Sequence, residues 1–204
     1  MYSTRSGLIL GFHGCDESVL FDVLNGKAEL RPSENNYDWL GSGTYFWEGN
    51  YDRALAFARH LKKHPSRSEG KTPIKTPAVL GAVISLGCCL DLLESDSLRK
   101  VEEAYLTLKE LEKDSEWTLP ENVGGSDLLL RRLDCAVIQN LHQSLDEGSD
   151  LYYDSVRGMF SEGKLLYPNA GFHKKNHIQL CIRNPNCIKG YFLPRKLTKT
   201  LKKI

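Results

Sequence analysis

The sequence lacks the cysteine patterns that mark metal-binding and secreted proteins. None of its six cysteines forms a Cys-x-x-Cys pair, and no His/Cys cluster has the spacing of a zinc site. We therefore expect no metal and no disulfide framework, but buried free thiols in a reducing compartment. The cysteines are Cys15, Cys88, Cys89, Cys135, Cys181 and Cys187.

Long apolar runs are also absent. Residues 1–9 carry one arginine and no extended apolar region, so no secretory signal is visible. The longest apolar stretch, residues 78–86, is interrupted by Gly81 and Ser85 and is far shorter than the ~20 residues of a membrane helix. We expect a cytoplasmic protein with no membrane partner.

Acidic residues are missing from the last part of the chain. The 204 residues carry 27 basic and 26 acidic side chains, but the last acidic one is Glu162. This uneven distribution predicts an acidic partner for the C-terminal part, with a solvated basic tail as the alternative. Ten basic residues follow: Lys164, Lys174, Lys175, Arg183, Lys189, Arg195, Lys196, Lys199, Lys202 and Lys203.

The remaining composition is that of an ordinary globular domain, with 41% hydrophobic and 26% charged residues. Short apolar runs predict strands, and apolar positions repeating every three or four residues predict helices. The mixture predicts an α+β fold with helices inserted between the strands of one sheet. We expect strands at 7–12, 41–47, 78–86, 154–160, 178–182 and 188–192, and helices at 17–25, 51–64, 97–111 and 127–145.

Two segments carry the features of a site. Gly11-Phe12-His13-Gly14 places a histidine at the end of an apolar strand, between glycines. Trp39-Leu40-Gly41-Ser42-Gly43-Thr44-Tyr45-Phe46 leads into a helix that contains Asp52-Arg53-Ala54. Gly41 and Gly43 precede a strand and not a helix, so they do not fit the Gly-x-Gly-x-x-Gly dinucleotide-binding motif.

In this order and spacing, the segments resemble the poly(ADP-ribose) polymerase and diphtheria-toxin branch of ADP-ribosyltransferases, and more narrowly its small bacterial toxins and defence proteins. The resemblance is strongest over residues 8–58, and residues 97–145 have no counterpart. It implies a single domain over residues 1–204, with a split β-sheet core and a helical insertion. It also implies that NAD is the co-substrate, that nicotinamide is released, and that ADP-ribose passes to a macromolecule.

The resemblance assigns roles to residues of both segments. The backbone of Gly14 would pair with the nicotinamide amide, and His13 would hydrogen-bond the adenine ribose. Tyr45 would stack on nicotinamide, since two flat rings give contact area and orientation at little entropic cost. Gly43 and Phe46 belong to the same motif and are expected at NAD.

The third catalytic position departs from the family. There the family has a glutamate at the start of the penultimate strand, which stabilises positive charge on the sugar. Here the segment Lys175-Asn176-His177-Ile178-Gln179-Leu180 has no carboxylate. His177 lies nearest to the glutamate position, and Gln179 shares its strand face. Glu162, the nearest acid in sequence, either reaches in from the preceding loop or is a solvated loop carboxylate.

The missing carboxylate favours transfer of a single ADP-ribose over polymer formation. Two alternatives remain: an NAD glycohydrolase that uses water as acceptor, and an inactive module that only binds NAD. RNA or DNA is slightly favoured over protein as acceptor because of the basic C-terminal part. An antitoxin is a further candidate partner.

Other polar and aromatic residues carry weaker predictions. Arg157 either meets the NAD pyrophosphate, since arginine recognises phosphate in a fork geometry, or forms a turn-holding pair with Asp154. Trp39 and Trp47 are expected to pack in the core or a loop. Four histidines lie on polar stretches and are assigned no role: His60, His64, His142 and His173.

Overall fold

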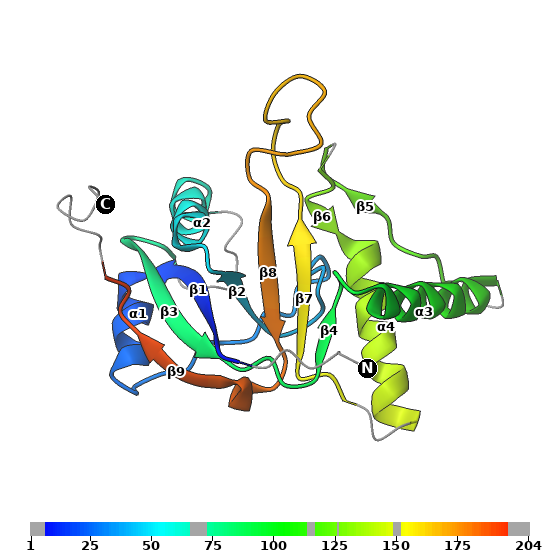
Figure 1. Cartoon of the computed structure of the whole chain (residues 1–204), viewed down its shortest axis with the longest axis horizontal. Coiled ribbons are helices and arrows are strands. Elements are labelled where there is room, and N and C mark those ends of the chain that lie inside the picture. Colours follow the sequence, from blue (N-terminus) through cyan, green and yellow to red (C-terminus); the bar gives the residue numbers. More distant parts are fainter. Residues whose placement is uncertain (1–6, 66–72, 114–116, 126, 149–151, 196–204) are drawn as a thin grey trace.

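The computed structural model describes residues 7–65, 73–113, 117–125, 127–148 and 152–195, which form an α+β fold with four α-helices and a large mixed sheet (Figure 1). The helices are α1 (Glu17–Leu24), α2 (Tyr51–Lys63), α3 (Ser95–Lys113) and α4 (Arg132–Gly148), with a short 3-10 helix at Pro185–Cys187. The strands are β1 (Ile9–Asp16), β2 (Thr44–Glu48), β3 (Pro77–Ile84), β4 (Cys89–Asp91), β5 (Asn122–Val123), β6 (Leu130–Arg131), β7 (Ser155–Phe160), β8 (His177–Ile182) and β9 (Ile188–Phe192).

The large sheet has seven strands in the order β4-β7-β8-β2-β1-β3-β9. Neighbouring strands are antiparallel except β4 and β7, which are parallel. β5 and β6 form a separate two-stranded sheet. Strands β1, β2 and β8 are therefore consecutive in the sheet, although β8 lies far from the other two in sequence.

The pairing within this sheet is shortest between β1 and β2. β1 pairs with β3 from Ile9 to Asp16, but with β2 only at Gly11 and Phe12. Just beyond these pairs, His13 connects the two strands, because its Nδ1–H donates to the Tyr45 carbonyl oxygen at 2.8 Å. The β1-β3-β9 part and the β8-β7-β4 part consequently lie on opposite sides of β2 (Figure 1).

Helices α1 and α2 cover opposite faces of the β1–β3 part. Side chains alternate between faces along a strand, so Gly14 and Cys15 face opposite sides. Cys15 packs against Leu20 of α1. At Gly14, a Cβ atom would collide with the carbonyl oxygen of Ala54 in α2. The close approach of α2 is therefore a structural reason for glycine at position 14.

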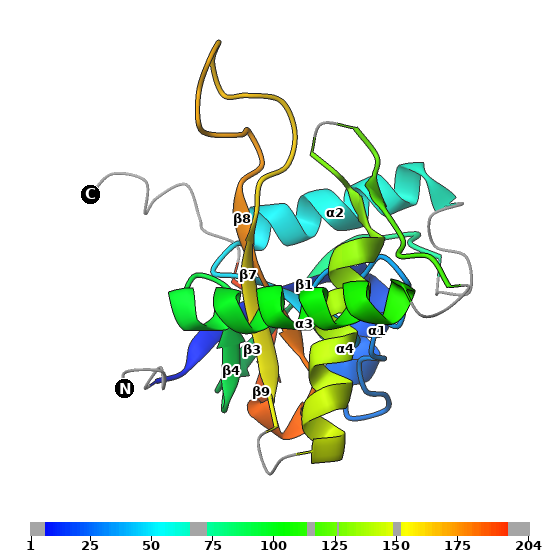
Figure 2. The same ribbon diagram turned by 90° about the vertical axis from the view of Figure 1, so that its right-hand side faces the viewer.

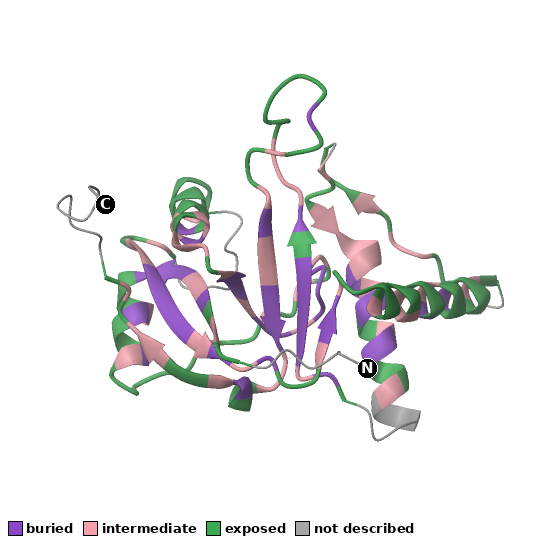
Figure 3. Ribbon diagram, viewed as in Figure 1, coloured by how far each residue is buried: buried purple, intermediate pink, exposed green. Residues whose placement is uncertain are grey.

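Helices α3 and α4 cover the β8-β7-β4 part on the same face as α2, and the strands beneath them are largely buried (Figures 2 and 3). No helix in the described ranges is both long enough and apolar enough to cross a membrane. The buried cluster between these helices and the sheet contains Trp39, Leu40, Leu90, Ala104, Leu108, Val137, Ile138, Leu141, Tyr153, Val156, Phe160 and Cys181.

Most expected elements are present, with shifted ends. β1 extends from the expected end at residue 12 to Asp16, because it pairs with β3 throughout. The helix expected from residue 127 begins at Arg132, after the β5–β6 turn, where Leu128 has a left-handed φ of 47°. β4, β5 and β6 were not expected, since strands of two or three residues are too short to show alternation.

The cysteines are free, and four of them are buried: Cys15, Cys135, Cys181 and Cys187. Cys88 is exposed, which corrects the expectation of a buried thiol at that position. The physical reason is a turn between β3 and β4, where Gly87 has a φ of 60°. Cys88 and Cys89 thus do not extend the buried run of β3.

Candidate functional site

The residues predicted for the site come from three neighbouring strands. His13 lies on β1, Tyr45 on β2, and His177 and Gln179 on β8. Tyr45 pairs with Cys181, two positions after Gln179, so Tyr45, Gln179 and His177 project from the same face. We refer to the side chains around the start of β8 as the β8 cluster: Trp39, Trp47, Arg53, Phe160, Glu162, Lys175, His177 and Gln179.

Tyr45 is half-buried, and its hydroxyl is fixed by two hydrogen bonds. It donates to the Gly41 carbonyl oxygen at 2.9 Å and accepts from the Leu40 N–H at 3.1 Å. Burial raises the pKa of Tyr45 well above its ordinary value, and the nearby Cys181 adds to this. The ring is therefore neutral and held in one orientation against the α3–α4 core.

Two other residues of the motif, Phe46 and Gly43, pack within the sheet. Phe46 is fully buried on the face opposite Tyr45, and its ring lies 5.8 Å from that of His13 in an edge arrangement. This burial corrects the expectation that the Phe46 side chain contacts NAD. A Cβ atom on Gly43 would lie 2.6 Å from Cys181 Sγ, so packing against β8 requires glycine there.

His177 is a buried, neutral imidazole with one unpaired nitrogen. Its ring stacks on Phe160 at 5.6 Å and 12°, and it lies 6.2 Å from the Trp47 ring. Its Nδ1–H donates to the Lys175 carbonyl oxygen at 2.7 Å, which leaves Nε2 as an acceptor. Burial lowers the pKa of His177; the Lys175 hydrogen bond opposes this, and the Arg53 charge reinforces it.

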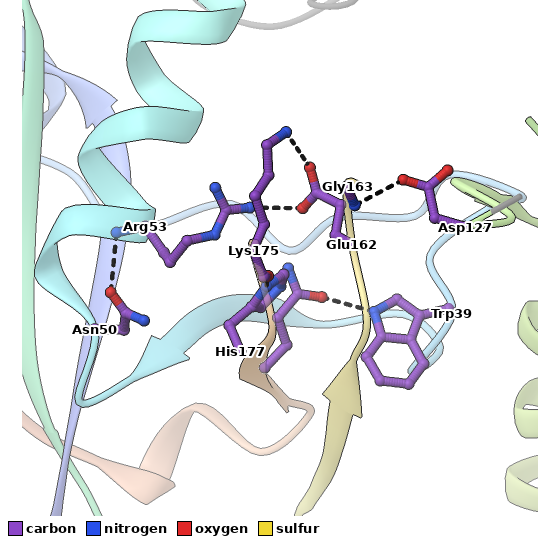
Figure 4. A network of polar contacts seen from close by, with 9 residues as sticks. Trp39, Asn50, Arg53, Asp127, Glu162, Gly163, Lys175 and His177 are labelled. Atoms are coloured by element: carbon purple, nitrogen blue, oxygen red, sulfur yellow. Dashed lines mark hydrogen bonds and ion pairs between the residues drawn. The ribbon is translucent and has the colours of Figure 1, made fainter. Parts of the chain in front are cut away.

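Glu162 is bonded to other side chains of the β8 cluster (Figure 4), and Gln179 accepts a hydrogen bond from one of them. Trp39 Nε1–H donates to Gln179 Oε1 at 2.6 Å, so the amide nitrogen of Gln179 keeps its donors. Glu162 is paired with Arg53 at 2.6 Å and with Lys175 at 2.7 Å, and its side chain is only 17% exposed. The alternative of a solvated loop carboxylate is therefore wrong, because Glu162 reaches in from the loop.

Three polar atoms of the β8 cluster are buried without a hydrogen-bond partner among the described residues. They are the donors Trp47 Nε1 and Arg53 Nε and the acceptor His177 Nε2. Leaving a buried polar group unpaired costs about 1–3 kcal/mol, so native structures usually satisfy such groups. The cluster therefore has donors and an acceptor that a polar ligand can satisfy.

Sequence reasoning missed Arg53 as a site residue. Its backbone N–H donates to the side chain of Asn50, which caps α2, at 3.0 Å. This cap places Arg53 in the first turn of α2, from which its guanidinium reaches Glu162. The sequence feature that indicated Arg53 was Asn50, the helix cap that follows β2. Side chains in the first turn of a helix lie close to the strand that precedes it.

Arg157 does not belong to this site. It is 4% exposed and lies between Glu48, at 2.6 Å, and Asp91, at 3.1 Å. The register places Arg157 opposite Leu180, on the face away from Tyr45. The expected pair with Asp154 is therefore wrong, because Asp154 accepts other hydrogen bonds. The Arg157 guanidinium is instead paired with Glu48 and Asp91, on the face away from Tyr45.

Outside this site, the described residues include neither a metal-binding group nor a reactive thiol in the hollow beside α4. It contains no group of three or more His, Cys, Asp and Glu side chains able to hold a metal ion. A hollow beside α4 includes Cys135, but burial raises the pKa of that thiol to about 11. A thiol with so high a pKa is protonated and a poor nucleophile at neutral pH.

Comparison with known proteins identifies an archaeal relative. The chain is similar to the uncharacterized protein MJ0359 of Methanocaldococcus jannaschii, with 25% identity over 213 residues, covering 93% of this chain and 90% of the relative. The similarity therefore extends well beyond the two motifs. No protein-family model matches the chain, and no solved structure matches it.

Proposed function

We propose that this chain is a mono-ADP-ribosyltransferase that binds NAD at the β8 cluster, releases nicotinamide and transfers ADP-ribose to a macromolecule. The observation that carries the proposal is His177. It stands where the resembling family has a glutamate, on the strand next to Tyr45, and it holds a buried unpaired acceptor. The short β1–β2 pairing supports the split core that the resemblance implies.

The side chains suit a bound nucleotide sugar. His177 Nε2 can accept a hydrogen bond from a ribose hydroxyl, as the family's glutamate would. The Tyr45 ring is half-buried and fixed by its two hydrogen bonds, so it would stack on nicotinamide without further ordering. The amide nitrogen of Gln179 can donate to a second oxygen. NAD supplies the bond between ribose and nicotinamide, with neutral nicotinamide as the leaving group.

The site differs from the family in charge. His177 is neutral, and Glu162, the acidic residue nearest to it in this cluster, is paired with Arg53 and Lys175. Positive charge that develops on the ribose would therefore receive less stabilisation than from a free carboxylate. This difference favours a slow transfer of one ADP-ribose over polymer synthesis.

The basic C-terminal part supports a polyanionic acceptor. Lys164 and Lys174 lie between β7 and β8, as does Lys175 of the β8 cluster, and no acidic residue follows Glu162. Basic groups near a site raise the local concentration of polyanions. We propose RNA or DNA ahead of protein as the acceptor, and a cytoplasmic toxin or defence effector, with an antitoxin as a candidate partner.

The neutral third position also favours a second candidate, an NAD-binding module without transfer, and water as acceptor would give a glycohydrolase. Incubation of the full chain with adenylate-labelled NAD and a cell extract separates these. Label on a macromolecule supports the transferase, free ADP-ribose alone supports the glycohydrolase, and unchanged NAD supports the binding module. Nuclease and protease digestion of the labelled product then identifies the acceptor class.

Substitutions of His177 test the assignment directly. His177→Ala should lower NAD turnover at least tenfold, in line with the loss of one hydrogen-bonding group at a reacting centre. His177→Glu should retain or raise turnover, because it restores the family's acceptor and its charge. His64→Ala, at the exposed end of α2, is the matched control. Wild-type turnover by a folded His177→Ala protein would remove His177 from the site.

A further inference from the structure

The loop between β7 and β8, residues 161–176, projects from the body of the protein (Figures 1 and 2). It is an ordered hairpin extension. Leu166 N–H donates to the Phe172 carbonyl oxygen at 2.8 Å, and Lys174 N–H donates to that of Lys164 at 2.9 Å. His173 Nδ1–H donates to the Gly163 carbonyl oxygen, also at 2.8 Å. These bonds hold the end of the loop in a defined shape.

The end of this loop is apolar and exposed. Leu165, Leu166, Tyr167 and Phe172 are 43%, 53%, 54% and 60% exposed. Single exposed apolar side chains are common on protein surfaces and need no explanation. Four on one projecting loop form a concentrated apolar surface that water solvates poorly, so the loop is suited to a partner that buries them.

Lysines flank this apolar end. Lys164 and Lys174 are joined by a backbone hydrogen bond at the base of the hairpin, and both are exposed. Lys175 follows and is also exposed, but its charge is paired with Glu162. The loop has no acidic residue after Glu162 at its base. The surface is therefore an apolar tip above a cationic base, which is complementary to an anionic surface with an apolar interior.

The residue types of this loop favour a lipid membrane over a protein as the partner. Protein interfaces are depleted in lysine, and their energetic hot spots favour Trp, Tyr and Arg over Leu. Helices that lie on membranes insert leucine and phenylalanine into the headgroup region, where lysine is attracted to anionic lipids, and the loop presents the same residue types. We propose that the β7–β8 loop docks the protein onto anionic lipid membranes.

Docking of this kind goes beyond the proposed NAD chemistry and does not depend on it. The expectation of no membrane partner rests on the absence of a spanning segment, which a surface-bound loop does not need. Glu162 and Lys175 connect the base of the loop to Arg53 in the β8 cluster. A docked protein would therefore hold the candidate site close to the lipid surface.

The test is co-sedimentation of the full chain with vesicles of phosphatidylcholine, with or without phosphatidylserine. The protein should sediment with the anionic vesicles, and Leu166→Ser combined with Phe172→Ser should weaken this binding at least tenfold. The matched control is Leu106→Ser combined with Leu111→Ser, at positions of α3 that are 53% and 56% exposed. The control variant should bind as the wild type does.

A second measurement follows the loop itself. Tyr167→Trp should shift its fluorescence to shorter wavelength when phosphatidylserine vesicles are added, because the indole leaves water. The proposal is overturned if the wild type ignores anionic vesicles, if the loop and control variants bind equally, or if no shift occurs. It is also overturned if the loop variant binds vesicles normally but loses RNA or protein binding.

Discussion

Replacement of His142 by leucine should make the protein more resistant to acid. His142 lies in α4 and is 5% exposed, and neither ring nitrogen has a hydrogen-bond partner in the described structure. Burial, reinforced by the positive charge of Arg183, lowers the pKa of His142 to about 3 from its model-peptide value of 6.5. The imidazole is therefore neutral in the folded protein across the mildly acidic range.

The sign of the effect follows from proton binding. Between pH 6.5 and 3 the unfolded chain protonates His142 and the folded protein does not, so falling pH favours unfolding. The expected loss is about 1.4 kcal/mol of unfolding free energy per pH unit, or about 2 kcal/mol at pH 5. His142→Leu removes this loss and also removes two unpaired nitrogens, so the variant should match or exceed wild-type stability at neutral pH.

Urea unfolding at pH 7.5, 6 and 5, followed by tryptophan fluorescence, measures this difference. Trp39 is a suitable reporter because it belongs to the same buried cluster as Leu141 and Tyr153. His64→Gln controls for the loss of a histidine at an exposed position. If wild type and His142→Leu lose stability in parallel as the pH falls, His142 is not a buried neutral group and the reasoning fails.

Substitutions of Tyr45, Gly14 and Arg157 test the fold and the site. Tyr45→Ala should lower NAD turnover at least tenfold, since base–aromatic stacking is worth about 1–3 kcal/mol. Tyr45→Phe should keep turnover, but it should lose about 1–2 kcal/mol of stability because the hydrogen bonds to Leu40 and Gly41 are removed. Fluorescent etheno-NAD measures the turnover, and equal rates for the two variants would contradict the stacking role. Gly14→Ala should lower the free energy of unfolding by about 1–3 kcal/mol in denaturant melts, because the added Cβ collides with α2. Gly190→Ala is the control and should change stability little, because a Cβ there meets nothing within 4 Å. Similar losses for the two variants would refute the close packing at Gly14. Arg157→Met should destabilise by about 3–5 kcal/mol, because it removes the buried guanidinium that pairs with Glu48 and Asp91. A near-neutral result would show that the ion-pair geometry is wrong.

Local patterns in the sequence predicted most of the helices and the longer strands. The apolar runs of β1 and β3 and the periodic face of α2 could be located because burial imposes a repeat along the chain itself. The motif resemblance placed His13, Tyr45 and His177 on strands that the structure shows to be neighbours. His13, however, follows Phe12, which shares the face of Trp47 and Tyr45, so the His13 ring lies on the opposite face, beside Phe46. The resemblance, however, gave no direct information on side-chain partners.

His142 shows where local reasoning fails. The sequence places it on a polar stretch, yet it follows the buried Ile138 by four residues and shares its helix face. That spacing was the available signal, but a histidine at a helix position is not decisive. The packing of α4 against the sheet determined that the ring is buried, and a local sequence pattern does not reveal that packing.

The sequence by itself determined the order of the helices and the longer strands, the absence of a carboxylate in the 175–180 segment and the excess of basic residues after Glu162. Only the tertiary structure decided which charges meet. The Arg53–Glu162 and Arg157–Glu48 pairs each join residues 109 positions apart, and they form on opposite faces of the sheet. Such pairs depend on strand order and register, which set the face of each side chain, and these emerge only when distant segments pack together.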